Sequence, residues 1–203
     1  MTSRRFFLSS CAGAALGLAG CDKLGLPGAG SKMSFNGTDI TGADYRYVLP
    51  DVSGRARGND DFKGKVTVVF FGYTQCPDVC PTTLAELAQV KKALGPDGER
   101  LQGVFITIDP ERDTPDVLRA YVGSFDPTFV ALRGTPEQTA AAAKAFKVFY
   151  AKVPGKDPGS YTMDHTAGSY VFDTEGRVRL FQRYGGGGVQ ALAADVKALL
   201  KTS

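Results

Sequence analysis

The stretch KVTVVFFGYTQCPDVCPTTLAELAQVKKAL, residues 65–94, decides the fold. Residues 65–73 form a continuous apolar run rich in β-branched and aromatic side chains, which is typical of a strand buried on both faces. Residues 81–94 place leucines on one side of a helix, with Pro81 in the first turn and Gly95-Pro96 to end it. A buried strand that leads directly into a helix predicts an α/β fold.

The chain on either side of this stretch alternates strands and helices. We expect further strands at residues 45–49, 101–108 and 129–132, helices at 114–122 and 135–146, a β-hairpin at 166–172 and 178–184, and a last helix at 189–200. This order predicts a thioredoxin-like α/β fold: a central mixed sheet flanked by helices, with a C-terminal β-hairpin and helix. We assign the domain to residues 35–203, with no internal repeat.

The N-terminus carries export signals. Residues 1–20 combine Arg4-Arg5, which resembles a twin-arginine signal, with an apolar stretch that is short for a membrane span. The sequence LAGC at 18–21 resembles a bacterial lipoprotein signal, in which cleavage leaves Cys21 as a lipidated N-terminus; the alternative is an ordinary secretory signal with an incidental cysteine. Residues 21–34, rich in Gly and Ser, predict a flexible tether. Asp22 resembles an inner-membrane retention signal, and we expect a lipid-anchored protein on the periplasmic face of the bacterial inner membrane.

Composition limits the chemistry to a few residues. The 203 residues carry a formal net charge of +3 and no basic run, which argues against nucleic acid as a partner. There are four cysteines and one histidine. Because Cys11 leaves with the signal and Cys21 carries the lipid, only Cys76 and Cys80 remain as thiols in the mature chain.

Cys76 and Cys80 lie where the buried strand meets the helix. The positive end of a helix dipole stabilises a thiolate there. Their Cys-x3-Cys spacing differs from the Cys-x2-Cys of thioredoxin-like redox motifs, and in a helical loop it would place both sulfurs on one face. The spacing leaves a metal site and a redox-active Cys76–Cys80 disulfide both open. A purely structural disulfide is the weaker alternative, because a bridge that closes so short a loop removes little entropy from the unfolded chain.

His165 is the third candidate. A lone histidine is often a surface or packed residue, but this one comes at the entrance to a predicted strand, after a Gly/Pro-rich loop at 154–161. Two thiolates and an imidazole suit copper, because thiolates select Cu(I) and imidazole binds both oxidation states. Structural zinc would need a further ligand, such as Asp78, Asp164 or water.

Three segments, FFGYTQCPDVCPTTL (70–84), ITIDPERDTP (106–115) and MDHTAGSYVFD (163–173), resemble the Sco/SenC proteins in order and spacing. The resemblance implies a membrane-anchored, thioredoxin-fold copper chaperone for the Cu(A) centre of cytochrome c oxidase. It implies Cu(I) or Cu(II) held by Cys76, Cys80 and His165. Implied partners are subunit II of the oxidase, a copper donor and a thiol reductant. Gln75 stands where many members have histidine.

A second function remains open at this stage, so the chain is not assigned as an enzyme or excluded as one. A thiol–disulfide oxidoreductase could keep the cysteines of the oxidase subunit reduced; one cysteine would attack and the other would resolve. His165 would then be incidental or assist proton transfer. Residues 162–165 contain no proline before the predicted strand, which favours binding over catalysis. Asp78 is either an auxiliary ligand or docking residue, or an acceptor for local amides.

Overall fold

The computed structural model describes residues 34–202. The predicted signal peptide and the tether up to Met33, with Arg4, Arg5 and Cys21, lie outside the described residues. Within the described part, no helix combines the length and hydropathy that a membrane span requires.

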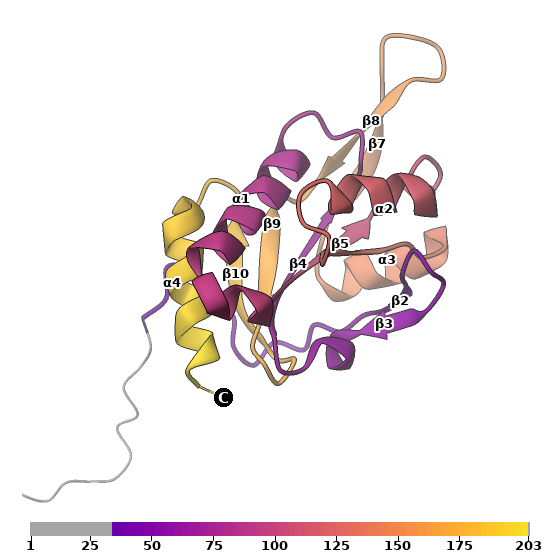
Figure 1. The fold of residues 1–203 in the computed structure, drawn as a ribbon. Coiled ribbons are helices and arrows are strands. Elements are labelled where there is room, and N and C mark those ends of the chain that lie inside the picture. Colours follow the sequence, from indigo (N-terminus) through magenta and orange to yellow (C-terminus); the bar gives the residue numbers. More distant parts are fainter. Residues whose placement is uncertain (1–33, 203) are drawn as a thin grey trace, which may run out of the picture. The chain divides into compact units, whose positions relative to one another are not determined.

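The centre of the domain is a six-stranded mixed sheet in the order β1-β10-β9-β4-β5-β6 (Figure 1). Strands β4, β5 and β6 are parallel to one another, whereas β9, β10 and β1 add antiparallel strands on the other side of β4. Their bounds are β1 Thr38–Asp39, β4 Val66–Gly72, β5 Leu101–Thr107, β6 Val130–Leu132, β9 Gly168–Phe172 and β10 Val178–Arg183. The predicted thioredoxin-like α/β fold, with its C-terminal hairpin β9–β10 and final helix, is confirmed.

Helices cover both faces of this sheet. They are α1 Val79–Ala93, α2 Pro115–Gly123, α3 Pro136–Ala145 and α4 Gly188–Leu200, with 3-10 turns η1 Asn59–Phe62 and η2 Gly95–Arg100. Apolar residues of α1, α2 and α4 share one core with Val68 and Phe70, whereas those of α3 share the other core with Val69 and Phe71. Every residue of β4 and β5 is buried, as the apolar run predicts for a strand covered on both sides.

Local capping chemistry fixes where α2 and α3 begin. The Thr114 hydroxyl accepts a hydrogen bond from the amide of Val117, and Pro115 occupies the first turn. Thr135 forms a capping box with Gln138 ahead of α3. Both starts agree with the sequence. Helix α1 begins at Val79, two residues before the predicted start, so that Cys80 is helical and Cys76 is not.

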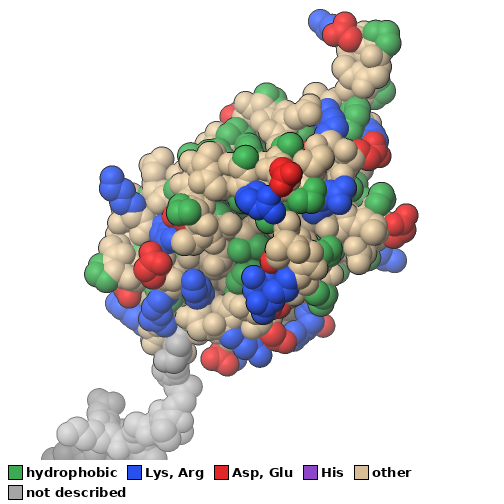
Figure 2. Space-filling model, turned by 45° about the vertical axis from the view of Figure 1, so that its right-hand side comes forward, with side chains coloured by type: hydrophobic (Ala, Val, Ile, Leu, Met, Phe, Trp, Pro, Cys, Tyr) green, Lys and Arg blue, Asp and Glu red, His purple; other side chains and the backbone are tan. Residues whose placement is uncertain are grey.

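Two hairpins stand outside the central sheet: β2 Val48–Pro50 with β3 Ala56–Gly58, and β7 Tyr150–Pro154 with β8 Tyr161–His165. The hairpin β7–β8 projects from the body of the domain (Figure 1), and its tip carries both acidic and basic side chains (Figure 2). This corrects the placement of His165, which ends β8 instead of entering the next strand, since β9 begins at Gly168. Strands β7 and β8 lie on either side of the loop that the sequence predicted at 154–161, and neither strand was expected.

Candidate metal centre

Three elements bring Cys76, Cys80 and His165 together. Cys76 lies in the loop between β4 and α1, Cys80 is the second residue of α1, and His165 is the last residue of β8. Their sulfur and nitrogen atoms all lie within 4.8 Å of one another, and Cys80 Sγ is 3.9 Å from His165 Nε2. Among the described residues, this is the one group of three or more His, Cys, Asp or Glu side chains that could hold a metal ion. Both thiols are free.

The end of β4 is shaped to accept the Cys80 sulfur. Gly72 is the last residue of this strand, and a Cβ added there would lie 2.5 Å from Cys80 Sγ and 2.8 Å from Phe105 Cε2. Only glycine leaves room for the sulfur at this position. Sequence reasoning missed Gly72, although a glycine inside an apolar strand is a known sign of close approach.

Replacing Gly72 with alanine should therefore lower the free energy of unfolding by about 1–3 kcal/mol, because the added methyl overpacks the core against a buried sulfur and a buried ring. Urea denaturation of the metal-free, reduced protein measures this change. Gly123→Ala is the matched control: no atom lies within 4 Å of its added Cβ, so its stability should be kept or raised. Equal stability of the two variants would contradict this account of Gly72.

The two cysteines differ in burial and in acidity. Cys80 is 1% exposed, whereas Cys76 is half-buried. A hydrogen bond from the Cys80 thiol, with backbone amides of Asp78 and Cys80 and a contact from His165, lowers the pKa of Cys76 to about 5. The hydrogen bond that the Cys80 thiol donates to Cys76, together with burial, raises the pKa of Cys80. At neutral pH the metal-free site therefore holds one thiolate, at Cys76, beside one thiol.

His165 directs its Nε2 nitrogen toward the cysteines. Its Nδ1 lies 3.0 Å from the carbonyl oxygen of Thr166, an acceptor, so Nδ1 carries the proton and donates it. Nε2, the other ring nitrogen, faces Cys80 Sγ. The edge of the imidazole also meets the Tyr73 ring, with centroids 6.1 Å apart and planes at 87°. A hydrogen bond from the ring nitrogen that does not face the ligand site, such as that of Nδ1 to Thr166, is how proteins orient histidine ligands.

The site opens to solvent through a cavity of about 430 Å³. Cys76 and His165 line it, together with apolar groups of Tyr73, Pro77 and Val153. Cys80 lies behind them in the core, packed with residues of α1. An ion entering from solvent therefore meets Cys76 and His165 first.

The other predicted candidates lie apart from the three. The exposed carboxylate of Asp78 accepts a hydrogen bond from the Tyr184 hydroxyl at 3.3 Å, and it lies outside the three-residue group. Gln75 accepts a hydrogen bond from Arg112. The structure adds one supporting residue that the sequence indicated only as a loop or helix-cap residue: buried Asp113 accepts hydrogen bonds from the amide and hydroxyl of Thr74, two residues before Cys76.

A thioredoxin-like domain with two cysteines and one histidine converging at an open cavity defines a class of metal-binding proteins built on a redox fold. The comparisons specify this class further. The sequence profile of the SCO1/SenC family matches residues 36–201, nearly all of the described chain. The chain belongs to the SCO1/SenC family.

Individual relatives agree with this assignment. A SCO2-like protein of Rickettsia felis is 37% identical over 152 residues, which cover 74% of this chain and 73% of that protein. The structure of copper-bound ScoI from Bradyrhizobium japonicum shares 43% identity and a TM-score of 0.68, covering 76% of this chain and 97% of that one. Copper-bound yeast Sco1 shares 30% identity and a TM-score of 0.69, covering 78% and 88% respectively.

Proposed function

We propose that this protein is a copper chaperone: it binds copper through Cys76, Cys80 and His165 and delivers it to the Cu(A) site of cytochrome c oxidase. The observation that carries the proposal is the convergence of two sulfurs and one imidazole nitrogen within 4.8 Å of one another. Copper-bound structures of similar Sco proteins support the choice of metal. A more distant Sco protein is described as a member of a family of cytochrome c oxidase assembly proteins, which supports the oxidase as the acceptor of the copper.

The ligand set itself favours copper over zinc. Structural zinc is held by four protein ligands, and no carboxylate among the described residues joins the three side chains. Cu(I) is satisfied by two or three soft ligands, and the imidazole extends the same site to Cu(II). Since metal binding requires deprotonated thiols, the existing thiolate at Cys76 lowers the cost of loading.

Copper titration of the reduced protein tests this function. We expect one copper per chain and, with Cu(II), an intense sulfur-to-copper charge-transfer band in the visible spectrum, because a thiolate donates charge to an oxidising d⁹ ion. Metal analysis after gel filtration gives the stoichiometry. A reduced protein that retains no copper and develops no band would overturn the proposal.

The anchor is the second part of the proposal. We place the mature protein on the periplasmic face of the bacterial inner membrane, attached through lipid on Cys21; the LAGC sequence at 18–21 supports this, as does the tether that follows. Cys21→Ser should leave the protein unprocessed or release it from the membrane. Cell fractionation decides, and a Cys21→Ser protein that is processed and still membrane-bound would contradict the anchor.

One observation favours a second function, the reduction of disulfides in the oxidase subunit. A half-buried Cys76 with a pKa of about 5 beside a buried, protonated Cys80 is the pairing of an attacking and a resolving thiol. Cys76 sulfur would attack a partner disulfide and release one partner thiolate. Cys80 would then displace the second thiolate and close a Cys76–Cys80 disulfide. Rapid disulfide turnover without a copper-dependent band would favour this function over the first.

A further inference from the structure

From the contacts of its side chain, we infer that Arg112 is a positioning residue for the metal site: it holds strand β8, and with it His165, at the correct distance from the two cysteines. The inference rests on the proposed copper-binding function for its consequence, but the geometric claim can be tested without metal. Arg112 touches none of the three candidate ligands.

The metal site is divided between two parts of the fold. Cys76 and Cys80 are carried by the end of β4 and the start of α1, which belong to the central sheet and its cover. His165 is carried by β8, which pairs with β7 in a separate two-stranded sheet. The backbone hydrogen bonds of the central sheet therefore do not set the distance from His165 to the sulfurs. Side-chain contacts must set it.

Strand β8 turns three side chains toward the body of the domain. Alternation along a strand puts Tyr161, Met163 and His165 on one face, with Thr162 and Asp164 on the other. Met163 is buried in the core beside α3, whereas the two outward residues are exposed. At the start of the strand Tyr161 must then be held by polar contacts, since it is only partly buried and lies at the edge of that core.

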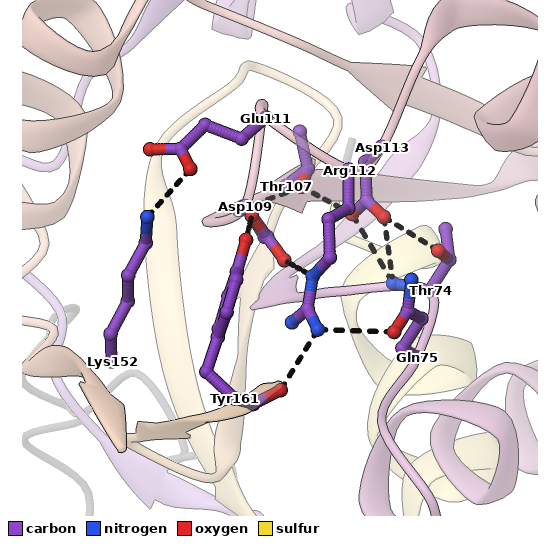
Figure 3. Close-up of polar contacts among 9 residues, drawn as sticks. All are labelled: Thr74, Gln75, Thr107, Asp109, Glu111, Arg112, Asp113, Lys152 and Tyr161. Atoms are coloured by element: carbon purple, nitrogen blue, oxygen red, sulfur yellow. Dashed lines mark hydrogen bonds and ion pairs between the residues drawn. The ribbon is translucent and has the colours of Figure 1, made fainter. Parts of the chain in front are cut away.

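Arg112 supplies those contacts (Figure 3). Its Nη1 donates hydrogen bonds to the carbonyl oxygen of Tyr161 at 2.8 Å and to Oε1 of Gln75 at 3.0 Å. Its guanidinium carbon lies 3.6 Å from the centroid of the Tyr161 ring and 5.8 Å from that of Tyr73. One planar group therefore touches β8, the residue next to Cys76 and the ring that meets His165. No lysine reproduces this fork and stacking.

Asp109 holds the Arg112 side chain in place through an ion pair. This carboxylate is buried; it accepts from Arg112 Nε through Oδ2 and from the Tyr161 hydroxyl through Oδ1 at 2.9 Å. Thr107 at the end of β5 donates to Asp113 and accepts from the Asp109 amide, which ties the loop to the central sheet. The chain of contacts runs from β5 through Asp109 and Arg112 to β8 (Figure 3).

A second contact between the loop 109–113 and the hairpin β7–β8 is weaker. Lys152 of β7 forms an ion pair with Glu111 at 2.6 Å, and both side chains are about half exposed, at 46% and 61%. Exposed pairs of this kind contribute little. Arg112 is 20% exposed and Asp109 1%, so their pair is shielded and holds its geometry.

The consequence for copper depends on its oxidation state. Two thiolates suffice for Cu(I), whereas Cu(II) needs the imidazole. Loosening β8 should therefore weaken Cu(II) binding and leave Cu(I) binding and the alkylation rate of Cys76 unchanged. For supporting residues behind metal ligands, losses of about 10–100-fold in affinity are typical, and we expect Arg112→Gln to fall in this range for Cu(II).

The chain offers a matched control in Arg119. It also pairs with an aspartate three residues earlier, Asp116, and also donates to a distant backbone carbonyl, that of Val52. None of its recorded partners belongs to the metal site. Arg119→Gln should change neither copper binding nor the site, which separates the role of Arg112 from the general loss of an arginine contact.

The experiment measures two quantities in the full-length, reduced protein. Without metal, NMR follows the through-space contact between ring protons of Tyr73 and His165, which Arg112→Gln should weaken or abolish and Arg119→Gln should keep. With Cu(II), titration gives the affinity and the charge-transfer band. Arg112→Lys should restore little of either, because a lysine cannot contact all three partners at once.

Each outcome decides a separate point. An unchanged ring contact and unchanged Cu(II) affinity in Arg112→Gln would overturn the inference. Wild-type protein that takes up no copper would overturn the proposed function, while the ring contact still decides whether Arg112 holds β8. If Arg112→Gln does not fold, Arg112→Lys, whose ammonium can still pair with Asp109, replaces it; a wild-type ring contact there would count against the positioning role.

Discussion

Cys80→Ser protein should take up no copper at concentrations that saturate the wild type, and its charge-transfer band should be absent. The substitution removes the buried sulfur that faces His165 Nε2 at 3.9 Å and puts a hard, protonated oxygen in its place. If structural metal sites gain about 10–16 kcal/mol over their ligands, one of three or four contributes roughly 3–5 kcal/mol, a loss of about two to four orders of magnitude.

Copper titration monitored by visible absorption checks this result. Cys80→Ala, which buries no hydroxyl, should behave in the same way and excludes an effect of the serine itself. Denaturation of the metal-free variants must show that they are folded. An unaltered band in either variant would remove Cys80 from the ligand set.

His165→Ala should lower the affinity for Cu(II) by roughly 100-fold or more, by the same estimate per ligand, while Cu(I) remains bound by the two sulfurs. Alkylation of the cysteines should proceed at close to the wild-type rate. The physical reason is that Cu(II) prefers more ligands and nitrogen donors, whereas two thiolates can hold Cu(I) in a near-linear arrangement. Parallel titrations with the two oxidation states give the ratio.

Free imidazole provides the control for this variant. Added to His165→Ala, it can occupy the space of the lost ring at the open cavity, and the Cu(II) band should return in part. Unchanged Cu(II) binding without imidazole would show that His165 is not a ligand. Slower alkylation with intact copper binding would instead identify it as a proton-transfer residue of a thiol–disulfide oxidoreductase.

The central sheet and the helices were predictable because their signals are local and strong. The apolar run before Gly72 indicates a buried strand, and Thr135-Pro136 indicates a helix start. The hairpin β7–β8 was not predictable. Three of the five residues of β7 are exposed, so the strand carries no alternating apolar pattern, and its pairing with β8 stabilises it only in the context of the folded body.

The candidate site, too, was predictable only in part. Cys76 and Cys80 were found from composition and from their place between strand and helix, and His165 as the single histidine of the chain. The geometry that makes them one site was not accessible, because it depends on a strand that sequence did not reveal. Arg112 lies in the segment 106–115 that resembles the family, but the sequence assigned it no role, since its contacts with Gln75 and Tyr161 are made only on folding.

The unequal depth of the two sulfurs has a kinetic consequence. In the delivery that we propose, an acceptor protein would approach the bound copper through the cavity, where Cys76 and His165 stand in front and Cys80 lies in the core. Ligand exchange would then follow an order: the acceptor's first donor would displace a front ligand, and the bond to Cys80 would break last. The buried sulfur would thus act as a retaining ligand that holds the copper until the acceptor has begun to bind it.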